Sequence, residues 1–326
     1  MIDYTIFGES HGPAIGVVLT GLPAGLTLDL DAIDRDMARR APGSSPLATA
    51  RKEADAVELL SGVFEGKTTG TPLCAMIRNT DTRSKDYSRL RDLPRPSHAD
   101  YTGAVRYGGY ADYRGGGHFS GRLTAPLVFA GAVAKQILDR KGIAVSSRIS
   151  MLGGLENPSA QDCERLILEA KAAGDSIGGA ISCTVTGIPA GFGAPDLGEN
   201  AEGIVAKHIF AVPGVKGLEF GAGFGFASLR GSQANDAFYY DGDAVKTRTN
   251  HSGGINGGIT NGMPLCFRVA MRPTPSIALA QQTVSLRGKT EENLTITGRH
   301  DPCIVMRALP VIEAAAALAV CELLDE

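Results

Sequence analysis

The sequence predicts a mixed α/β protein of one domain that contains an internal duplication. Residues 8–26 read GESHGPAIGVVLTGLPAGL and residues 174–192 read GDSIGGAISCTVTGIPAGF, and they align without a gap with about ten of nineteen positions identical. A chain of 326 residues with 43% hydrophobic content can also bury a large core. Two copies at this spacing are too few for a solenoid, so we expect a duplicated domain.

Each repeat is followed by a helical pattern. The patterns cover residues 31–40 in the first half and 202–211 in the second, and each reaches a Pro-Gly pair of the kind that ends helices, Pro42-Gly43 and Pro213-Gly214.

Residues 66–74 (GKTTGTPLC) and 258–266 (GITNGMPLC) extend the repeat, because Gly, Thr, Gly, Pro, Leu and Cys recur at the same relative positions. Each half is therefore predicted as strand, turn, helix and hairpin strands. A last helical run covers residues 311–324. No Ser/Pro-rich or charged linker interrupts the chain, so residues 1–326 are predicted as one domain of two pseudo-repeated halves, about 1–150 and 151–326.

Composition excludes several classes of protein. The net charge of -3 and the isoelectric point near 6.1 give no electrostatic case for binding nucleic acid or an anionic membrane. The sequence has neither an apolar run of eighteen residues nor a charged-then-apolar N-terminus, which predicts a soluble cytoplasmic protein. Its six scattered cysteines are predicted to be reduced core residues.

Glycine is over-represented, with 42 residues that cluster at 115–117, 221–225 and 253–258. Such clusters allow positive φ and let backbone N–H groups approach a phosphate-bearing cofactor, although tight turns between strands explain most of them. Residues 62–68 (GVFEGKT) have one residue too few between the glycines for a P-loop. Residues 221–226 (GAGFGF) lack the third glycine of a Rossmann motif.

The histidines indicate proton-transfer chemistry. His11 aligns with Ile177 in the second repeat. The histidine therefore serves a purpose that is specific to the first half, rather than a structural one common to both. His98 lies in a Pro-restricted loop and His300 in another loop, and no pair of histidines has metal-ligand spacing, so no metal site is predicted. An imidazole can donate or accept a proton near neutral pH.

Several arginines adjoin Gly, Pro or Ser in loops, where a guanidinium can bind carboxylate or phosphate. These are Arg39, Arg40, Arg114, Arg122, Arg272 and Arg299. The residues thus predict a site for a small polyanion with histidine proton donors and loops for a phosphorylated cofactor, and they leave the reaction open.

Seven segments together resemble the chorismate synthase family across nearly the whole chain. They are residues 8–23 (GESHGPAIGVVLTGLP), 61–72 (SGVFEGKTTGTP), 95–102 (RPSHADYT), 114–122 (RGGGHFSGR), 229–236 (LRGSQAND), 250–258 (NHSGGINGG) and 298–303 (GRHDPC). Any one segment is weak evidence, whereas all of them in this order are highly specific.

The resemblance implies a lyase of the shikimate pathway, and so of aromatic amino-acid biosynthesis. It would convert 5-enolpyruvylshikimate 3-phosphate to chorismate and phosphate by 1,4-anti elimination. The family needs reduced FMN, with NADPH as a candidate reductant of the flavin, although the reaction has no net redox change. The implied fold is an internally duplicated sandwich with helices between two antiparallel β-sheets, assembled as a homotetramer.

The resemblance also implies roles for individual residues. His11 would protonate the departing phosphate, His98 would share a proton with the flavin, and Asp301 would help remove the substrate proton. Arg40 and Arg122 would meet the substrate, Arg40 being also a candidate contact for the pyridine nucleotide. The implied flavin contacts are His118, Phe119, Ser120, Gln233, Ala234, Gly257, Arg272, Pro273, Thr274, Pro275, Ser276 and Arg299.

The sequence departs from the family pattern at two places in the chain. His118-Phe119-Ser120 stands where many members have Arg-Ser-Ser, and Pro46 stands where many have a second arginine. Both changes affect expected contacts with phosphate or nucleotide. The residues also leave two other classes of function open. An FMN-binding redox protein would turn over flavin without depending on His11, and a non-catalytic phospho-ligand binding module would bind without forming product.

Overall fold

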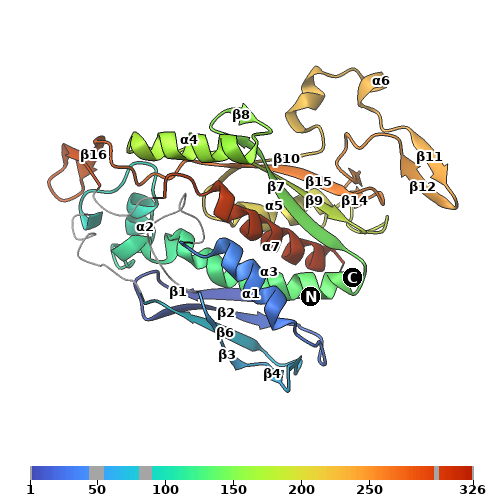
Figure 1. The fold of residues 1–326 in the computed structure, drawn as a ribbon, viewed down its shortest axis with the longest axis horizontal. Coiled ribbons are helices and arrows are strands. Elements are labelled where there is room, and N and C mark those ends of the chain that lie inside the picture. Colours follow the sequence, from blue (N-terminus) through green and yellow to red (C-terminus); the bar gives the residue numbers. More distant parts are fainter. Residues whose placement is uncertain (1, 44–54, 81–89, 297–300, 325–326) are drawn as a thin grey trace.

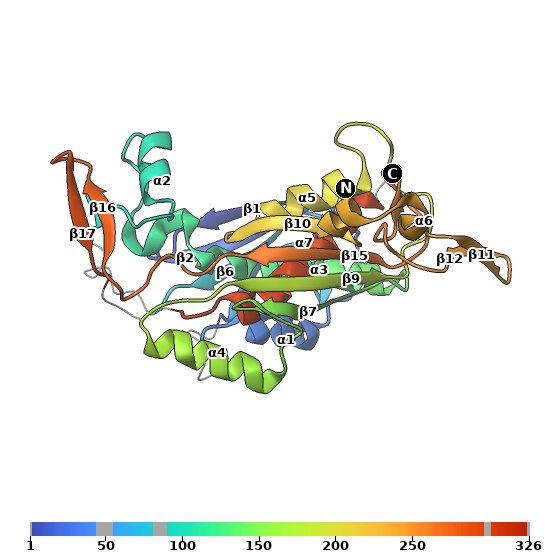
Figure 2. The same ribbon diagram turned by 90° about the horizontal axis from the view of Figure 1, so that it is seen from above.

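The computed structural model describes residues 2–43, 55–80, 90–296 and 301–324. Two antiparallel sheets enclose a layer of helices, as Figures 1 and 2 show. This arrangement confirms the predicted α/β sandwich. Within the described part of the chain, no helix has both the length and the apolar character needed to cross a membrane.

The first sheet has the strand order β1-β2-β6-β3, with every neighbouring pair antiparallel. Its strands are β1 (Asp3–Gly8), β2 (Ala14–Thr20), β3 (Val57–Ser61) and β6 (Leu73–Arg78). Ile15, Val17 and Leu19 alternate along β2 and are fully buried. Because alternate side chains of a strand point to one face, these three side chains pack against the helical layer.

The second sheet has the order β10-β15-β9-β7-β8. Its strands are β7 (Ala144–Leu152), β8 (Leu155–Glu156), β9 (Gly179–Thr186), β10 (Val215–Phe220) and β15 (Leu265–Met271). Ile181, Cys183 and Val185 alternate along β9 and are buried. The second sheet therefore presents an apolar face to the same helices.

Helices of both halves form the middle layer (Figure 1). They are α1 (Leu30–Arg40), α3 (Thr124–Asp139), α5 (Ala201–Phe210) and α7 (Val305–Leu323). Gly131 of α3 faces Ala314 of α7 so closely that a Cβ added to Gly131 would lie 2.2 Å from the Cβ of Ala314. Small residues at this crossing let the two central helices meet.

The other elements surround this core. They are the helices α2 (Asp100–Arg106), α4 (Ala160–Ala172) and α6 (Gly231–Ala234), the 3₁₀ segments η2 (Arg114–Phe119), η3 (Gly121–Leu123) and η4 (Gly223–Ser228), and the hairpin strands β4 (Val63–Phe64), β5 (Lys67–Thr68), β11 (Phe238–Asp241), β12 (Ala244–Thr247), β13 (Ile255–Asn256), β14 (Ile259–Thr260), β16 (Gln281–Ser285) and β17 (Thr290–Leu294).

The two halves have the same topology. Strands β1, β2, β3 and β6 of the first sheet take the same positions as β7, β9, β10 and β15 of the second, and α1 and α3 take those of α5 and α7. The repeated sequence segments contain β2 and β9, each paired with the strand of the later repeat, β6 or β15. The second set of these elements begins with β7 at Ala144.

Candidate functional site

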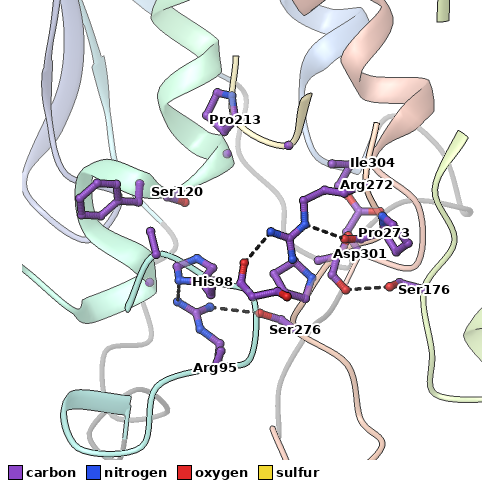
Figure 3. Close-up of a pocket in the computed structure, with 18 of the residues that line it drawn as sticks. Arg95, His98, Ser120, Ser176, Pro213, Arg272, Pro273, Ser276, Asp301 and Ile304 are labelled. Atoms are coloured by element: carbon purple, nitrogen blue, oxygen red, sulfur yellow. Dashed lines mark hydrogen bonds between the residues drawn. The ribbon is translucent and has the colours of Figure 1, made fainter. Parts of the chain in front are cut away.

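A cavity of about 1440 Å³ lies where the loops of both halves meet (Figure 3). Eleven of the residues predicted from the sequence line it: His11, His98, His118, Phe119, Ser120, Arg272, Pro273, Thr274, Pro275, Ser276 and Asp301. A smaller cavity of about 230 Å³ contains Arg40 and Arg122 and shares Ser120 and Asp301 with the larger one.

Three predicted flavin contacts line neither cavity. Gln233 and Ala234 lie on α6, and Gly257 lies in the turn between β13 and β14. Figures 1 and 2 show α6 at the opposite end of the molecule from α2 and the β16–β17 hairpin. Arg299 lies outside the described residues, as do Pro46 and His300.

His11 lies in the loop between β1 and β2 and is 8% exposed. The loop docks on the triple glycine of η2, because Ser10 N–H donates to the Gly117 carbonyl (3.1 Å) and Ser10 Oγ donates to that of Gly115 (2.9 Å). Gly115, Gly116 and Gly117 all have positive φ, at 61°, 83° and 54°. Only glycine adopts this conformation readily. The three glycines therefore form the surface on which the His11 loop packs.

His118 belongs to the same wall as His11. Its Nδ1 lies 2.9 Å from the Gly8 carbonyl oxygen, which can only accept a hydrogen bond. Nδ1 therefore carries the proton, and Nε2 of the neutral ring is an acceptor.

His98 lies in the loop before α2. Its Nδ1 is 2.6 Å from Oδ1 of Asp100, and Arg95 in turn holds Asp100 with Nε–Oδ2 and Nη2–Oδ1 distances of 2.7 and 2.8 Å. The same loop is joined to the opposite wall. Arg95 Nη1 donates to Ser276 Oγ (3.1 Å), and Arg272 Nη1 donates to the Ser97 carbonyl (2.5 Å; Figure 3).

Asp301 lies just before α7 and is 9% exposed. Its Oδ2 accepts a hydrogen bond from Arg307 Nη1 (2.8 Å) and its Oδ1 accepts one from the Cys303 N–H (3.3 Å). Burial raises the pKa of Asp301 above its usual value, and the positive charge of Arg307 offsets this only in part. A carboxylate with a raised pKa is a stronger base than an ordinary aspartate.

Arg40 and Arg122 meet at a buried carboxylate. Arg40 Nη1 lies 2.5 Å from Asp55 Oδ2, and Arg122 Nη1 donates to Asp55 Oδ1, whose side chain is 0% exposed. Burial would raise the pKa of Asp55, but the two guanidinium groups outweigh it and lower the pKa. The triad has two positive charges and one negative charge, and so suits an anion in the smaller cavity.

The second copy of the repeated loop forms the opposite wall of the cavity. Asp175 and Ser176, which align with Glu9 and Ser10, both line it. Ser176 Oγ donates to the Thr274 carbonyl (2.7 Å). The N–H of Ile177 donates to the Pro302 carbonyl (2.9 Å), so the residue that aligns with His11 supports the segment after Asp301.

Four important residues were not predicted from the sequence: Arg95, Asp100, Asp55 and Arg307. Arg95 and Asp100 flank His98 within one short motif, and that proximity was the available signal. Asp55 and Arg307 carry no comparable signal, because they reach the site only through the packing of α1, η3 and α7.

A cleft that combines histidines, a carboxylate and guanidinium groups defines an enzyme that handles small anionic molecules. Comparison with protein families identifies which one. The model described as "Chorismate synthase" matches residues 2–324, and the chain therefore belongs to the chorismate synthase family, whose members are lyases.

Individual relatives agree with this assignment. The chain is 45% identical to the chorismate synthase of Thermococcus kodakarensis over 99% of this chain and 95% of that protein. It is 46% identical to the chorismate synthase of Chitinophaga pinensis over 97% of this chain and 92% of that protein. A solved structure described as "Crystal Structure of Chorismate Synthase" superimposes with a TM-score of 0.76 at 28% identity, covering 99% of this chain and 91% of that one.

Proposed function

We propose that this chain converts 5-enolpyruvylshikimate 3-phosphate to chorismate and phosphate by 1,4-anti elimination, with reduced FMN as cofactor. The observation that carries the proposal is the convergence of His11, His98 and Asp301 on one cavity in a chain that matches the family from end to end. We expect the enzyme to be cytoplasmic.

The charge of the site favours this substrate. Two carboxylates and a phosphate call for fixed cations, and Arg272 lines the large cavity while Arg40 and Arg122 line the small one. Asp55 holds the latter pair in a fixed position. Because Arg40 is only 3% exposed, a ligand would reach it from the small cavity, which opens beside Asp301.

The proton transfers are assigned to side chains on different walls. His11 donates a proton to the departing phosphate, so charge does not accumulate on the leaving group. Asp301 accepts the proton removed from the substrate, and its raised pKa suits it to this role. His98 shares a proton with the reduced cofactor. The loops of both halves must be in place for these steps.

The residues present fit a flavin mononucleotide. The cavity of about 1440 Å³ has room for it beside the substrate. Thr274 Oγ1 is buried and, among the described residues, has no hydrogen-bond partner, which is expected where a ligand completes the site. His118, Phe119, Ser120 and residues 272–276 would hold the flavin. When bound, it would lend electron density transiently while the C–O bond to phosphate breaks.

Gln233, Ala234 and Gly257 need a separate explanation as flavin contacts. They line neither cavity of their own chain, so they can take part only if another copy of the chain brings them there. This requirement favours the homotetramer that the resemblance implies. Arg40 remains a candidate contact for a reduced pyridine nucleotide that reduces the flavin.

An anaerobic assay tests the proposal. The protein is mixed with 5-enolpyruvylshikimate 3-phosphate and chemically reduced FMN, and chorismate and phosphate are followed over time beside a sample with oxidised FMN. We expect equal amounts of both products with reduced FMN only. Net flavin turnover without chorismate would identify a redox protein, and tight binding without product would identify a binding module.

A further inference from the structure

A chain of hydrogen bonds runs from His98 to the opposite wall of the cavity. It joins His98 to Asp100, Asp100 to Arg95, and Arg95 to Ser276 on the opposite wall. Asp100 is 5% exposed and Arg95 is 6% exposed at their side chains, whereas His98 is 15% exposed and lines the cavity. Asp100 and Arg95 both contact the imidazole ring. Arg95 also lines the cavity, whereas Asp100 does not.

The contact between His98 and Asp100 determines which ring nitrogen carries the proton. At 2.6 Å from an ionised carboxylate oxygen, an unprotonated Nδ1 would place two lone pairs against each other. Nδ1 must therefore be protonated. Arg95 Nη2 also lies 3.0 Å from Nδ1, but both groups are then donors, so this contact is not a hydrogen bond and Nη2 donates to Asp100 instead.

Arg95 keeps Asp100 in its ionised form. The carboxylate accepts hydrogen bonds from Arg95 Nε (2.7 Å), Arg95 Nη2 (2.8 Å) and the Arg95 backbone N–H (3.0 Å). Burial would raise the pKa of Asp100, but the hydrogen bonds from Arg95 and His98 outweigh it and the pKa lies well below the usual range. Asp100 therefore accepts the Nδ1 hydrogen bond without taking the proton.

The opposite edge of the ring faces Gly116. A Cβ added to Gly116 would lie 3.2 Å from Cε1 and 3.3 Å from Nε2 of His98. A side chain at Gly116 would crowd this edge of the ring, and His98 itself lines the cavity. With Nδ1 protonated, Nε2 of the neutral ring presents a lone pair.

We propose that Asp100 is a positioning residue that fixes the Nδ1–H tautomer of His98, and that Arg95 holds Asp100 in place, so that Nε2 faces the cavity as a proton acceptor. The tautomer follows from the ligand-free geometry alone, whereas its effect on turnover rests on the proposed function. Arg95 also contacts Ser276, so the tautomer of a histidine in the first half is linked to a loop of the second half.

The test is Asp100→Asn, which keeps the shape of the side chain. Arg95 donates to both carboxylate oxygens, so it will retain the amide oxygen and turn the amide NH₂ toward Nδ1. Nδ1 must then accept, and His98 changes to the Nε2–H tautomer. Solid-state ¹⁵N spectra of ligand-free protein labelled at the histidine rings, taken at about pH 8 where histidine is neutral, report the two tautomers directly. A His98→Gln sample assigns the His98 signals.

Asp112→Asn is the matched control, because Asp112 forms a similar two-point pair with Arg114, at 2.9 and 2.7 Å, that does not involve His98. We expect the wild type and Asp112→Asn to show protonated Nδ1 at His98, and Asp100→Asn to show protonated Nε2. Asp100→Glu should keep the wild-type tautomer and part of the activity. Arg95→Lys, which keeps the positive charge, should give a mixture of tautomers.

Turnover provides the second readout. In the anaerobic assay, kcat of Asp100→Asn should fall roughly 10²–10⁴-fold with KM changed only a few-fold, as expected when a general acid–base group has the wrong tautomer. Protonated Nδ1 in Asp100→Asn, or an unchanged kcat despite a changed tautomer, would overturn the proposal. The spectra need no substrate or cofactor, so a wild-type protein that forms no chorismate contradicts the proposed function without deciding the tautomer.

Discussion

The imidazole ring of His11 lies against the α-carbon of Gly115, about a hundred residues away in the sequence. A Cβ built on Gly115 would lie 2.5 Å from both Cδ2 and Nε2 of the ring. Gly115 also has a φ of 61°, which side chains disfavour. The orientation of the proposed phosphate acid therefore depends on a missing side chain in a different loop.

Gly115→Ala should displace His11 and strain the η2 turn at the same time. We expect a loss of stability of about 1–2 kcal/mol from the backbone conformation alone, and a fall in kcat of at least about tenfold as the ring moves. Denaturant unfolding and the anaerobic assay measure the two effects. Gly225→Ala is the control, because a Cβ there meets nothing within 4 Å and its φ is not positive. Equal effects of the two substitutions would contradict the role of Gly115.

Asp301→Asn should separate activity from stability. Because burial raises the pKa of Asp301 in the folded state, its contribution to stability is fully present below the usual pKa and is lost as pH rises through the raised value. Ionised Asp301 therefore destabilises the fold at pH 7. We expect Asp301→Asn to lower kcat roughly 10²–10⁴-fold while its Tm at pH 7 is no lower than that of the wild type. A large fall in Tm would show that Asp301 is mainly structural.

Asp55→Asn should destabilise the fold strongly, because it leaves the buried guanidinium groups of Arg40 and Arg122 without their shared anion. Removing one partner of a buried ion pair costs about 3–5 kcal/mol. The exposed pair of Glu58 with Arg78 gives the control, since Glu58→Gln should change stability by less than about 1 kcal/mol. Urea unfolding of both variants checks the difference, and comparable small effects would refute it.

Glu313 predicts a pH dependence of stability. It accepts hydrogen bonds from Arg39, Lys135 and Ser147 within the helical layer. Burial alone would raise its pKa, but these partners lower the pKa of Glu313 to about 2. The stability gained is present above the unfolded pKa near 4.5 and is lost as pH falls toward 2.

Glu313→Gln should therefore be less stable than the wild type at pH 7 by about 3 kcal/mol, since a tenfold change in acid dissociation corresponds to about 1.4 kcal/mol. The difference should shrink as pH falls from about 4.5 toward 2. Unfolding midpoints over this pH range measure it. A difference that is independent of pH would show that the ionised form of Glu313 is not what stabilises the fold.

The repeated segments predicted the two strands of each repeat, because a repeated pattern reflects local structure. The family motifs indicated that His11, His98 and Asp301 lie in one site, and all three line one cavity. The sequence was not sufficient for α7, which begins at Val305 although the predicted helical run began at residue 311. Pro310 normally ends a helix. Here it is buried within α7, where tertiary packing outweighs the local rule.

Long-range polar contacts were equally hard to predict. Nothing near Asp55 in the sequence shows that its carboxylate binds two guanidinium groups, because Arg122 comes from a distant segment. A match to a family motif also does not show where in the molecule its residues lie. Gln233, Ala234 and Gly257 belong to matching motifs, yet they lie away from the cavity of their own chain.

The role of His11 is tested most directly by the anaerobic release of phosphate and chorismate by wild type and His11→Ala, with reduced FMN and with thermal unfolding as the control for folding. We expect turnover by the wild type with reduced FMN only, and a fall in kcat of roughly 10²–10⁴-fold in a variant that remains folded. Wild-type levels of both products from folded His11→Ala would show that this histidine, present in one half only, is not the acid of the reaction.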